Sequence, residues 1–154
     1  MCRAHATVRG VLGGLVAGTS RTTIVDLEAG LEHLSRGTAR HVETLLVVGE
    51  PYFKSLETAG RSFALAKDLG ISQVRMVANK VRTSRDEETV RDYAARHHMP
   101  IAAVVPYDEA VVAADERGIA LIEYDPAAPS VVAITQLAED LLTSAGAPAD
   151  PGGR

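Results

Sequence analysis

Four short runs of apolar and β-branched residues limit what this chain can fold into more than any other feature. Each run has the length of a β-strand and is nearly continuously apolar, which is typical of strands covered by other elements on both faces. A strand with one face in water would instead alternate apolar and polar residues. The sequence therefore predicts four strands, at Thr22–Leu27, Thr44–Gly49, Gln73–Ala78 and Ile101–Val105.

Amphipathic helical patterns separate or follow these runs. Apolar residues recur every three or four positions over Tyr52–Leu69, and Gly70 is a glycine of the kind that follows helix ends. A second pattern covers Ser84–His98, with Ser84 as the expected N-cap, and a third covers Val131–Leu142. Because strand–helix–strand repeats make right-handed crossovers, we predict an α/β fold. Its centre is an open parallel sheet of about four strands with helices on both faces.

Length and composition set the limits of this fold. The 154 residues suffice for one domain, which we place at residues 1–145, and the Pro/Gly-rich residues 146–154 are expected to be a disordered tail. One cysteine excludes a disulfide scaffold, and no apolar run approaches the ~18 residues of a membrane span. A net charge of −4 and 4% aromatic residues argue against nucleic-acid binding. We expect a cytoplasmic protein that binds neither membranes nor nucleic acid.

Polar residues follow each predicted strand. In open parallel sheets, ligands bind outside the carboxyl ends of the strands, so these residues are the candidates for a functional site. Polar turn residues with no role in binding are the alternative for any single loop, but four such loops at one edge favour a site. The four groups are Asp26 to Gly30, Glu50-Pro51, Asn79-Lys80 and Pro106-Tyr107-Asp108.

Three of these residues suggest parts of a nucleotide site. A carboxylate such as Asp26 at a strand end can hold a water bound to Mg²⁺, although it can also cap a following helix. Gly30 would let the backbone approach a terminal phosphate and act as a hinge. The amide of Asn79 offers a donor and an acceptor to a purine edge.

A phosphate-binding loop is not found by its motif. Residues 13–20 imitate the spacing GxxxxGK(S/T), but Thr19 stands where the lysine belongs. The motif also needs a strand before the loop and a helix after it, whereas here a helical pattern at His5–Ala17 comes first. We therefore do not assign this stretch to phosphate binding.

One block of fifteen residues resembles a known family. Residues 25–39 read VDLEAGLEHLSRGTA, and later landmarks include Asn79-Lys80-Val81 and Val105-Pro106-Tyr107-Asp108. The block is similar to the second switch of the CooC-like ATPases, which insert nickel during maturation of carbon monoxide dehydrogenase. That family belongs to the MinD/ParA group of deviant P-loop ATPases. The resemblance covers residues 2–142, and the fifteen-residue block is its specific part.

The resemblance implies a nucleotide site and a metal site. Asp26 would support Mg²⁺ through water and Gly30 would be a hinge, both serving ATP hydrolysis. ATP or ADP would bind with its adenine near Asn79, Lys80, Pro106, Tyr107 and Asp108, where Tyr107 could stack on the base or pack against its own loop. Cys2 resembles the second cysteine of a Cys-x-Cys pair that holds nickel or zinc between the subunits of a dimer. The implied partners are a second copy of the chain and carbon monoxide dehydrogenase or a similar metalloenzyme.

The sequence departs from the family in one respect that bears on function. The family's phosphate loop and its lysines precede the switch segment, and they are not found in these residues. We therefore expect the carboxy-terminal portion of such an ATPase, unable to hydrolyse ATP alone. The alternatives are a protein-interaction module that binds through the charged surface at residues 28–36, and a degenerate MinD/ParA-like paralogue.

Overall fold

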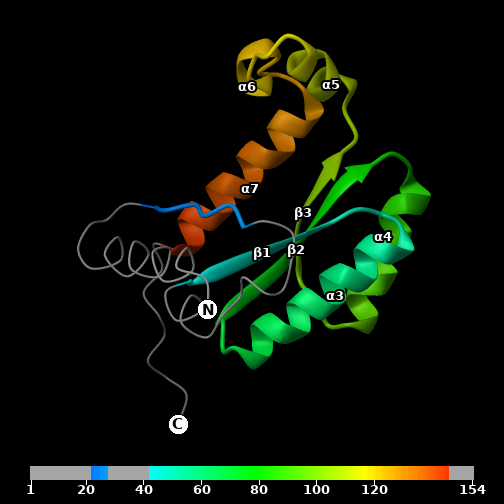
Figure 1. Cartoon of the computed structure of the whole chain (residues 1–154), viewed down its shortest axis with the longest axis vertical. Coiled ribbons are helices and arrows are strands. Elements are labelled where there is room, and N and C mark those ends of the chain that lie inside the picture. Colours follow the sequence, from blue (N-terminus) through cyan, green and yellow to red (C-terminus); the bar gives the residue numbers. More distant parts are fainter. Residues whose placement is uncertain (1–21, 28–41, 146–154) are drawn as a thin grey trace, which may run out of the picture.

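The structure is a computed structural model that describes residues 22–27 and 42–145. It confirms the α/β class: three parallel strands lie side by side in the order β1-β2-β3, with helices on both faces (Figure 1). No helix within the described ranges is long and apolar enough to cross a membrane. The elements are β1 (Thr44–Gly49), α3 (Phe53–Asp68), β2 (Gln73–Val81), α4 (Ser84–Arg96), β3 (Ile101–Pro106), α5 (Glu109–Glu116), α6 (Leu121–Tyr124) and α7 (Pro129–Ala145).

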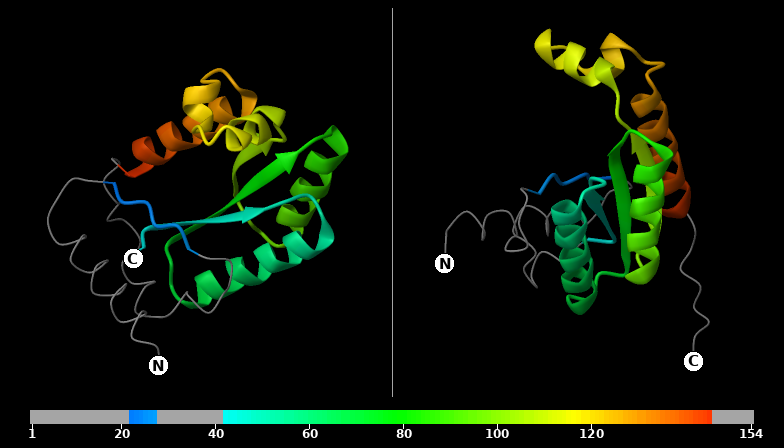
Figure 2. Two further views of the ribbon diagram at one scale, coloured as in Figure 1. Left: turned by 45° about the horizontal axis from the view of Figure 1, so that its top comes forward. Right: turned by 90° about the vertical axis from the view of Figure 1, so that its right-hand side faces the viewer.

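The strand order determines which helices share a face. Helix α3 connects β1 to β2 and α4 connects β2 to β3, so two right-handed crossovers in the same direction put both helices on one side of the sheet. Residues of α3, α4 and the strands form one buried cluster there, which includes Leu56, Met76 and Val90. Helix α7 packs against β3 on the opposite face, where Val77, Val105 and Leu137 form a second buried cluster. The right-hand view in Figure 2 shows α7 and α3 on different sides of the strands.

The first predicted strand is wrong. Residues 22–27 have no regular secondary structure, and the sheet of the described residues contains three strands rather than four. Ile24 is 92% exposed, so this apolar run is not part of the core. The apolar, β-branched composition is that of a strand, but a strand also needs a partner backbone, which composition cannot supply.

Local sequence signals determine where α3 ends and where α4 begins. Gly70 has φ +81°, a left-handed conformation that suits glycine, and it ends α3 as predicted. The predicted N-cap of α4 is wrong by one residue, because Thr83 rather than Ser84 holds that position. The Thr83 hydroxyl accepts from the Asp86 N–H, and the Asp86 carboxylate accepts from the Thr83 N–H at 3.0 Å. This reciprocal pair is a capping box.

Candidate functional site

The candidate site lies at the carboxyl edge of the sheet, where the parallel strands end. Strand β2 runs three residues further than predicted. Asn79 and Lys80 therefore lie within the carboxyl end of the strand rather than in a loop. Tyr107 follows β3 directly, and its N–H donates to the carbonyl oxygen of Val81 at 2.8 Å. The structure therefore brings all five predicted base-binding residues to one edge: Asn79, Lys80, Pro106, Tyr107 and Asp108.

A bulge shapes the end of β2. Ala78 pairs with Val104 and Val81 pairs with Pro106, so two residues of β2 face one residue of β3. One of these two residues of β2, Lys80, has φ +56°, which is unusual for a residue with a side chain. A left-handed conformation costs such a residue roughly 1–2 kcal/mol. The surrounding contacts must offset this cost.

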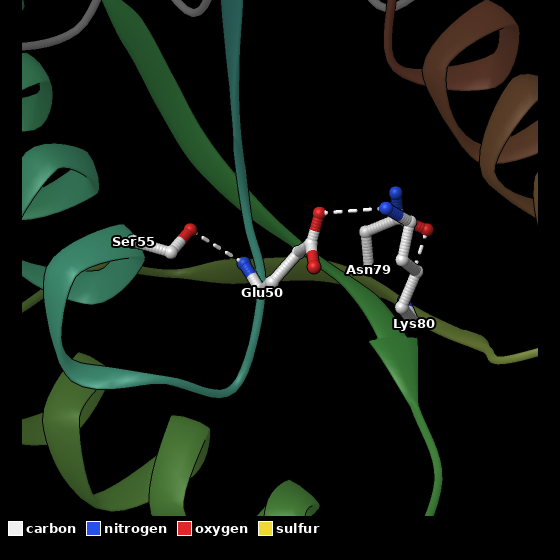
Figure 3. A network of polar contacts seen from close by, with 4 residues as sticks. All are labelled: Glu50, Ser55, Asn79 and Lys80. Atoms are coloured by element: carbon white, nitrogen blue, oxygen red, sulfur yellow. Dashed lines mark hydrogen bonds and ion pairs between the residues drawn. The ribbon is translucent and has the colours of Figure 1, made fainter.

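An ion pair joins the bulge to the end of β1 (Figure 3). The Nζ of Lys80 lies 2.9 Å from Oε1 of Glu50, the residue that follows β1. The backbone N–H of Glu50 in turn donates to the hydroxyl oxygen of Ser55, in the first turn of α3, at 2.8 Å. Glu50 raises the pKa of the Lys80 ammonium, chiefly by accepting its hydrogen bond. Lys80 is therefore cationic and held toward Glu50.

Asn79 is the residue of this group whose side chain could best read a base. Its Oδ1 accepts the N–H of Lys80 at 3.0 Å. Within the described ranges, no hydrogen bond engages its amide nitrogen. The amide therefore presents two N–H donors, and its oxygen retains a second lone pair. A donor beside an acceptor is the pattern that a purine edge can match.

Asp108 has a structural task at the same edge. Its Oδ1 accepts the N–H of Ala110 at 2.9 Å and so caps α5. Its Oδ2 accepts from both the N–H and the hydroxyl of Ser130, at 3.2 and 2.9 Å. The Ala110 N–H, followed by the two donors of Ser130, lowers the pKa of the Asp108 carboxyl from its ordinary value of 3.8. One carboxylate thus ties the start of α5 to the start of α7.

The ring of Tyr107 packs against the side chain of Arg82. The guanidinium carbon of Arg82 lies 3.4 Å from the centroid of the Tyr107 ring, which is a cation–π contact. Arg82 follows β2, so this contact joins the loops after β2 and β3. Arg82 is an exposed residue, and its head group covers the ring.

The other predicted site residues are not brought to this edge by any described contact. Asp26 lies in the exposed segment 22–27, and no hydrogen bond or ion pair within the described ranges joins it to Asn79 or Pro106. Gly30 and Cys2, as well as the charged surface at residues 28–36, lie outside the described residues. In the part of the chain that is described, no group of three or more His, Cys, Asp or Glu could hold a metal ion.

Sequence reasoning missed the residues that support the site. Glu50 was visible as a polar residue directly after a strand, but nothing in the sequence pairs it with Lys80, which is 30 positions away. Ser130 lies directly before the helical pattern predicted at Val131–Leu142, and its bond to Asp108 spans 22 positions. Such pairings depend on strand order and register, which a single sequence does not specify.

Comparisons with known proteins agree with this architecture. The chain is 35% identical over 127 residues to the carbon monoxide dehydrogenase accessory protein CooC of Rhodospirillum rubrum, covering 82% of this chain and 48% of that protein. It is 38% identical over 119 residues to an ATP-binding protein of Methanocaldococcus jannaschii, covering 77% of this chain and 46% of the relative. The chain thus spans about half the length of the curated relatives it matches.

Among solved structures, the fold matches the septum site-determining protein MinD of Pyrococcus horikoshii, which was determined with Mg-ADP. The TM-score is 0.74 at 21% identity, and the match covers 92% of this chain and 58% of that one. No protein-family model matches the chain. The sequence likeness to CooC and the ATP-binding proteins, together with the MinD-like fold, shows that the chain belongs to the CooC-like members of the MinD/ParA-type family.

Proposed function

We propose that this chain is the carboxy-terminal part of an ATP-binding ATPase that matures a metal centre, and that it supplies the side of the nucleotide site that contacts the base. One observation carries the proposal. In a chain similar to CooC over 82% of its length, the carboxyl end of β2, between β1 and β3, holds an asparagine whose amide oxygen accepts the N–H of Lys80. The P. horikoshii MinD structure contains Mg-ADP, which supports a nucleotide as the ligand.

The residues at the edge fit a base in different ways. The Asn79 amide would exchange hydrogen bonds with an adenine edge, and the half-buried Pro106 and Tyr107 would pack beside the ring. Lys80 and Asp108 would act through the contacts described above, because their charged groups bind Glu50 and Ser130. By the family resemblance, Asp26 would hold Mg²⁺ through water and Gly30 would act as a hinge. The phosphates would be bound by residues that precede these in the family.

The wider role follows the relative's name. The R. rubrum protein is an accessory protein of carbon monoxide dehydrogenase, so we propose that enzyme, or a similar metalloenzyme, as the client. Nickel would be the cargo, held with Cys2 between two copies of the chain, although zinc would suit the same thiolates. Hydrolysis of ATP by the whole assembly would supply the free energy for the transfer. This role would be carried out in the cytoplasm.

The proposal sets an expected affinity. In nucleotide hydrolases most of the binding contacts are made to the phosphates, by backbone amides and lysines of the phosphate loop. A chain that offers only the base contacts should bind Mg-ADP with a dissociation constant of about 1 mM or weaker, which corresponds to about −4 kcal/mol.

A titration followed by NMR tests both the site and the affinity. We expect Mg-ADP to shift the resonances of Asn79 and of the residues after β3, with a dissociation constant in the millimolar range, and we expect Asn79→Ala to remove these shifts. Gln73→Ala is the matched control, because Gln73 is exposed at the opposite end of the same strand. Micromolar binding of Mg-ADP would contradict the view that the phosphate-binding residues lie outside this chain. Shifts confined to another part of the molecule, or none at about 10 mM Mg-ADP, would overturn the proposed site.

A further inference from the structure

The bulge at the end of β2 controls the direction of one peptide group. Lys80 has φ +56°, and the register shift leaves Asn79 and Lys80 opposite a single residue of β3. The N–H of Lys80 belongs to the peptide between these two residues, so the torsion angles on either side determine where it points. In this structure it points at the side chain of Asn79 and donates to Oδ1 at 3.0 Å.

This hydrogen bond determines on which side of the Asn79 side chain the amide oxygen and the amide nitrogen lie. Because the Lys80 N–H is a donor, the oxygen of the Asn79 side chain must face it and the NH₂ group must face away. An adenine presents an N6 donor beside an N1 acceptor, whereas a guanine presents an O6 acceptor beside an N1 donor. For a base bound in one pose, an amide that can rotate by half a turn matches either purine, but an amide held in one orientation matches only one.

Two further contacts hold the bulge in place. The Lys80 Nζ is 2.9 Å from Glu50 Oε1, and the Glu50 N–H donates to Ser55 Oγ at 2.8 Å (Figure 3). The side chain of Lys80 is 55% exposed and that of Glu50 is 31% exposed. Exposed ion pairs contribute little to the stability of a fold, so stability alone does not account for a strained lysine bound to this carboxylate.

We propose that Glu50, acting through Lys80, is a positioning residue that fixes the orientation of the Asn79 amide and thereby makes the site select adenine over guanine. The proposal rests on the proposed function, since it presumes that Asn79 contacts the base. Glu50 itself touches no ligand. Its carboxylate holds the Lys80 side chain toward β1, and the left-handed backbone at Lys80 then keeps its N–H on the Asn79 oxygen.

The test compares six variants with the wild-type chain. Glu50→Gln and Lys80→Met each remove the ion pair with little change of shape, the double variant tests whether the two act together, and Lys80→Arg retains a cation as a rescue. Glu87→Gln is the matched control, because it removes the other ion pair of the described ranges, Arg91–Glu87. Asn79→Ala reports on base contact itself.

Two readouts separate positioning from folding. The first is the pair of Asn79 side-chain amide resonances without nucleotide, which we expect to shift or broaden in Glu50→Gln and Lys80→Met and to stay unchanged in Glu87→Gln. The second is the ratio of the initial chemical-shift slopes at residues after β3 with Mg-ADP and with Mg-GDP. We expect this preference for ADP to fall about fivefold in either variant, with no further fall in the double variant. Lys80→Arg should stay within about twofold of wild type.

The outcomes distinguish the two proposals. If Asn79→Ala weakens Mg-ADP binding but Glu50→Gln and Lys80→Met keep the wild-type preference and amide resonances, the positioning inference is wrong and the proposed function stands. If Asn79→Ala binds Mg-ADP as the wild-type chain does, the proposed function is wrong and the inference falls with it. A separate fall in preference in the double variant, beyond that of either single change, would also overturn the inference.

Discussion

The two faces of the sheet are held by different means. On the face covered by α3 and α4, fourteen buried residues form one continuous cluster, including Met76 and Val90, both with 0% exposure. On the face covered by α7, the buried cluster consists of three residues, Val77, Val105 and Leu137. Val48 of β1, which lies beyond the reach of this small cluster, is 60% exposed.

The α7 face has a polar contact at the start of its helix. Asp108 accepts two hydrogen bonds from Ser130 at the start of α7, and Ser130 is only 2% exposed. Helix α7 is thus fixed at its first turn by a carboxylate and along its length by a few side chains. The comparison indicates that packing dominates on the α3/α4 face, whereas the α7 face combines a small core with one titratable group.

The largest expected effect comes from truncating the larger cluster. Met76→Ala should lower the free energy of unfolding by about 2–5 kcal/mol, because it leaves a cavity in a fully buried site. Leu137→Ala should cost about 2 kcal/mol, the lower end of that range, since its partly buried neighbours can close the space. Urea unfolding measures both, with the exposed Val132→Ala as control. A larger loss for Leu137→Ala would reverse the comparison.

The contact between α3 and α4 gives the next effect. A Cβ at Gly60 would lie 2.5 Å from the hydroxyl oxygen of Tyr93, so Gly60→Ala should cost about 1–3 kcal/mol although alanine favours helices. Tyr93→Phe removes that oxygen, together with its 3.1 Å hydrogen bond to Glu57. In the Tyr93→Phe background, Gly60→Ala should therefore cost about 1 kcal/mol less. Equal costs in both backgrounds would show that the helices can separate freely.

The polar contact on the α7 face predicts a dependence on pH. The pKa of the Asp108 carboxyl is lowered in the folded state, chiefly by the Ala110 N–H and then by Ser130. Its contribution to stability is therefore present above the unfolded value and is lost as pH falls through the folded pKa. Ser130→Ala removes one donor, so the folded pKa should rise and the loss in acid should begin at higher pH.

Urea midpoints measured from neutral to acidic pH check this prediction. Ser144→Ala is the matched control on the same helix, because the Ser144 hydroxyl donates only to the carbonyl oxygen of Asp140. Its acid profile should follow that of the wild-type chain. Coincident profiles for Ser130→Ala and wild type would show that the Ser130 hydroxyl does not stabilise the Asp108 carboxylate.

The smallest effect is expected for a surface charge on the α3/α4 face. Glu87 and Arg91 form an ion pair whose side chains are 39% and 57% exposed. Glu87→Gln should cost about 0.3–0.5 kcal/mol in urea unfolding, and less in high salt. Glu88→Gln, at an exposed neighbouring position, is the control. A loss above about 1 kcal/mol would mean that charges stabilise this face more than its packing suggests.

Much of the fold could be predicted because it depends on local patterns. The periodicity over Tyr52–Leu69 predicted α3 to within a residue at each end, and Gly70 predicted its end. The N-cap of α4 was misplaced because Thr83 and Ser84 are both good caps. Each has an acidic residue three positions later, Asp86 and Glu87, so the capping-box pattern does not distinguish them. Segment 22–27 was misassigned because strand composition does not ensure strand pairing.

The candidate site was predicted by position but not by chemistry. The rule that ligands bind at strand carboxyl ends predicted that Asn79, Pro106 and Tyr107 lie at one edge of the sheet, and the structure places them there. The rule does not say which polar groups serve the fold, and the carboxylate of Asp108 is engaged in capping. The left-handed Lys80 was also invisible, since no glycine or asparagine occupies that position to signal it.

The bond between Asp108 and Ser130 also bears on how this protein could be engineered. The segment between these two residues contains α5 and α6. Its two ends are 22 residues apart in the sequence and are joined by this hydrogen bond. The middle of that segment, at Gly118, has φ +62° and open space where a side chain would be. Because each doubling of a loop's length costs only about 0.6 kcal/mol, a fluorescent or affinity tag grafted after Gly118 should leave the sheet and its carboxyl edge intact.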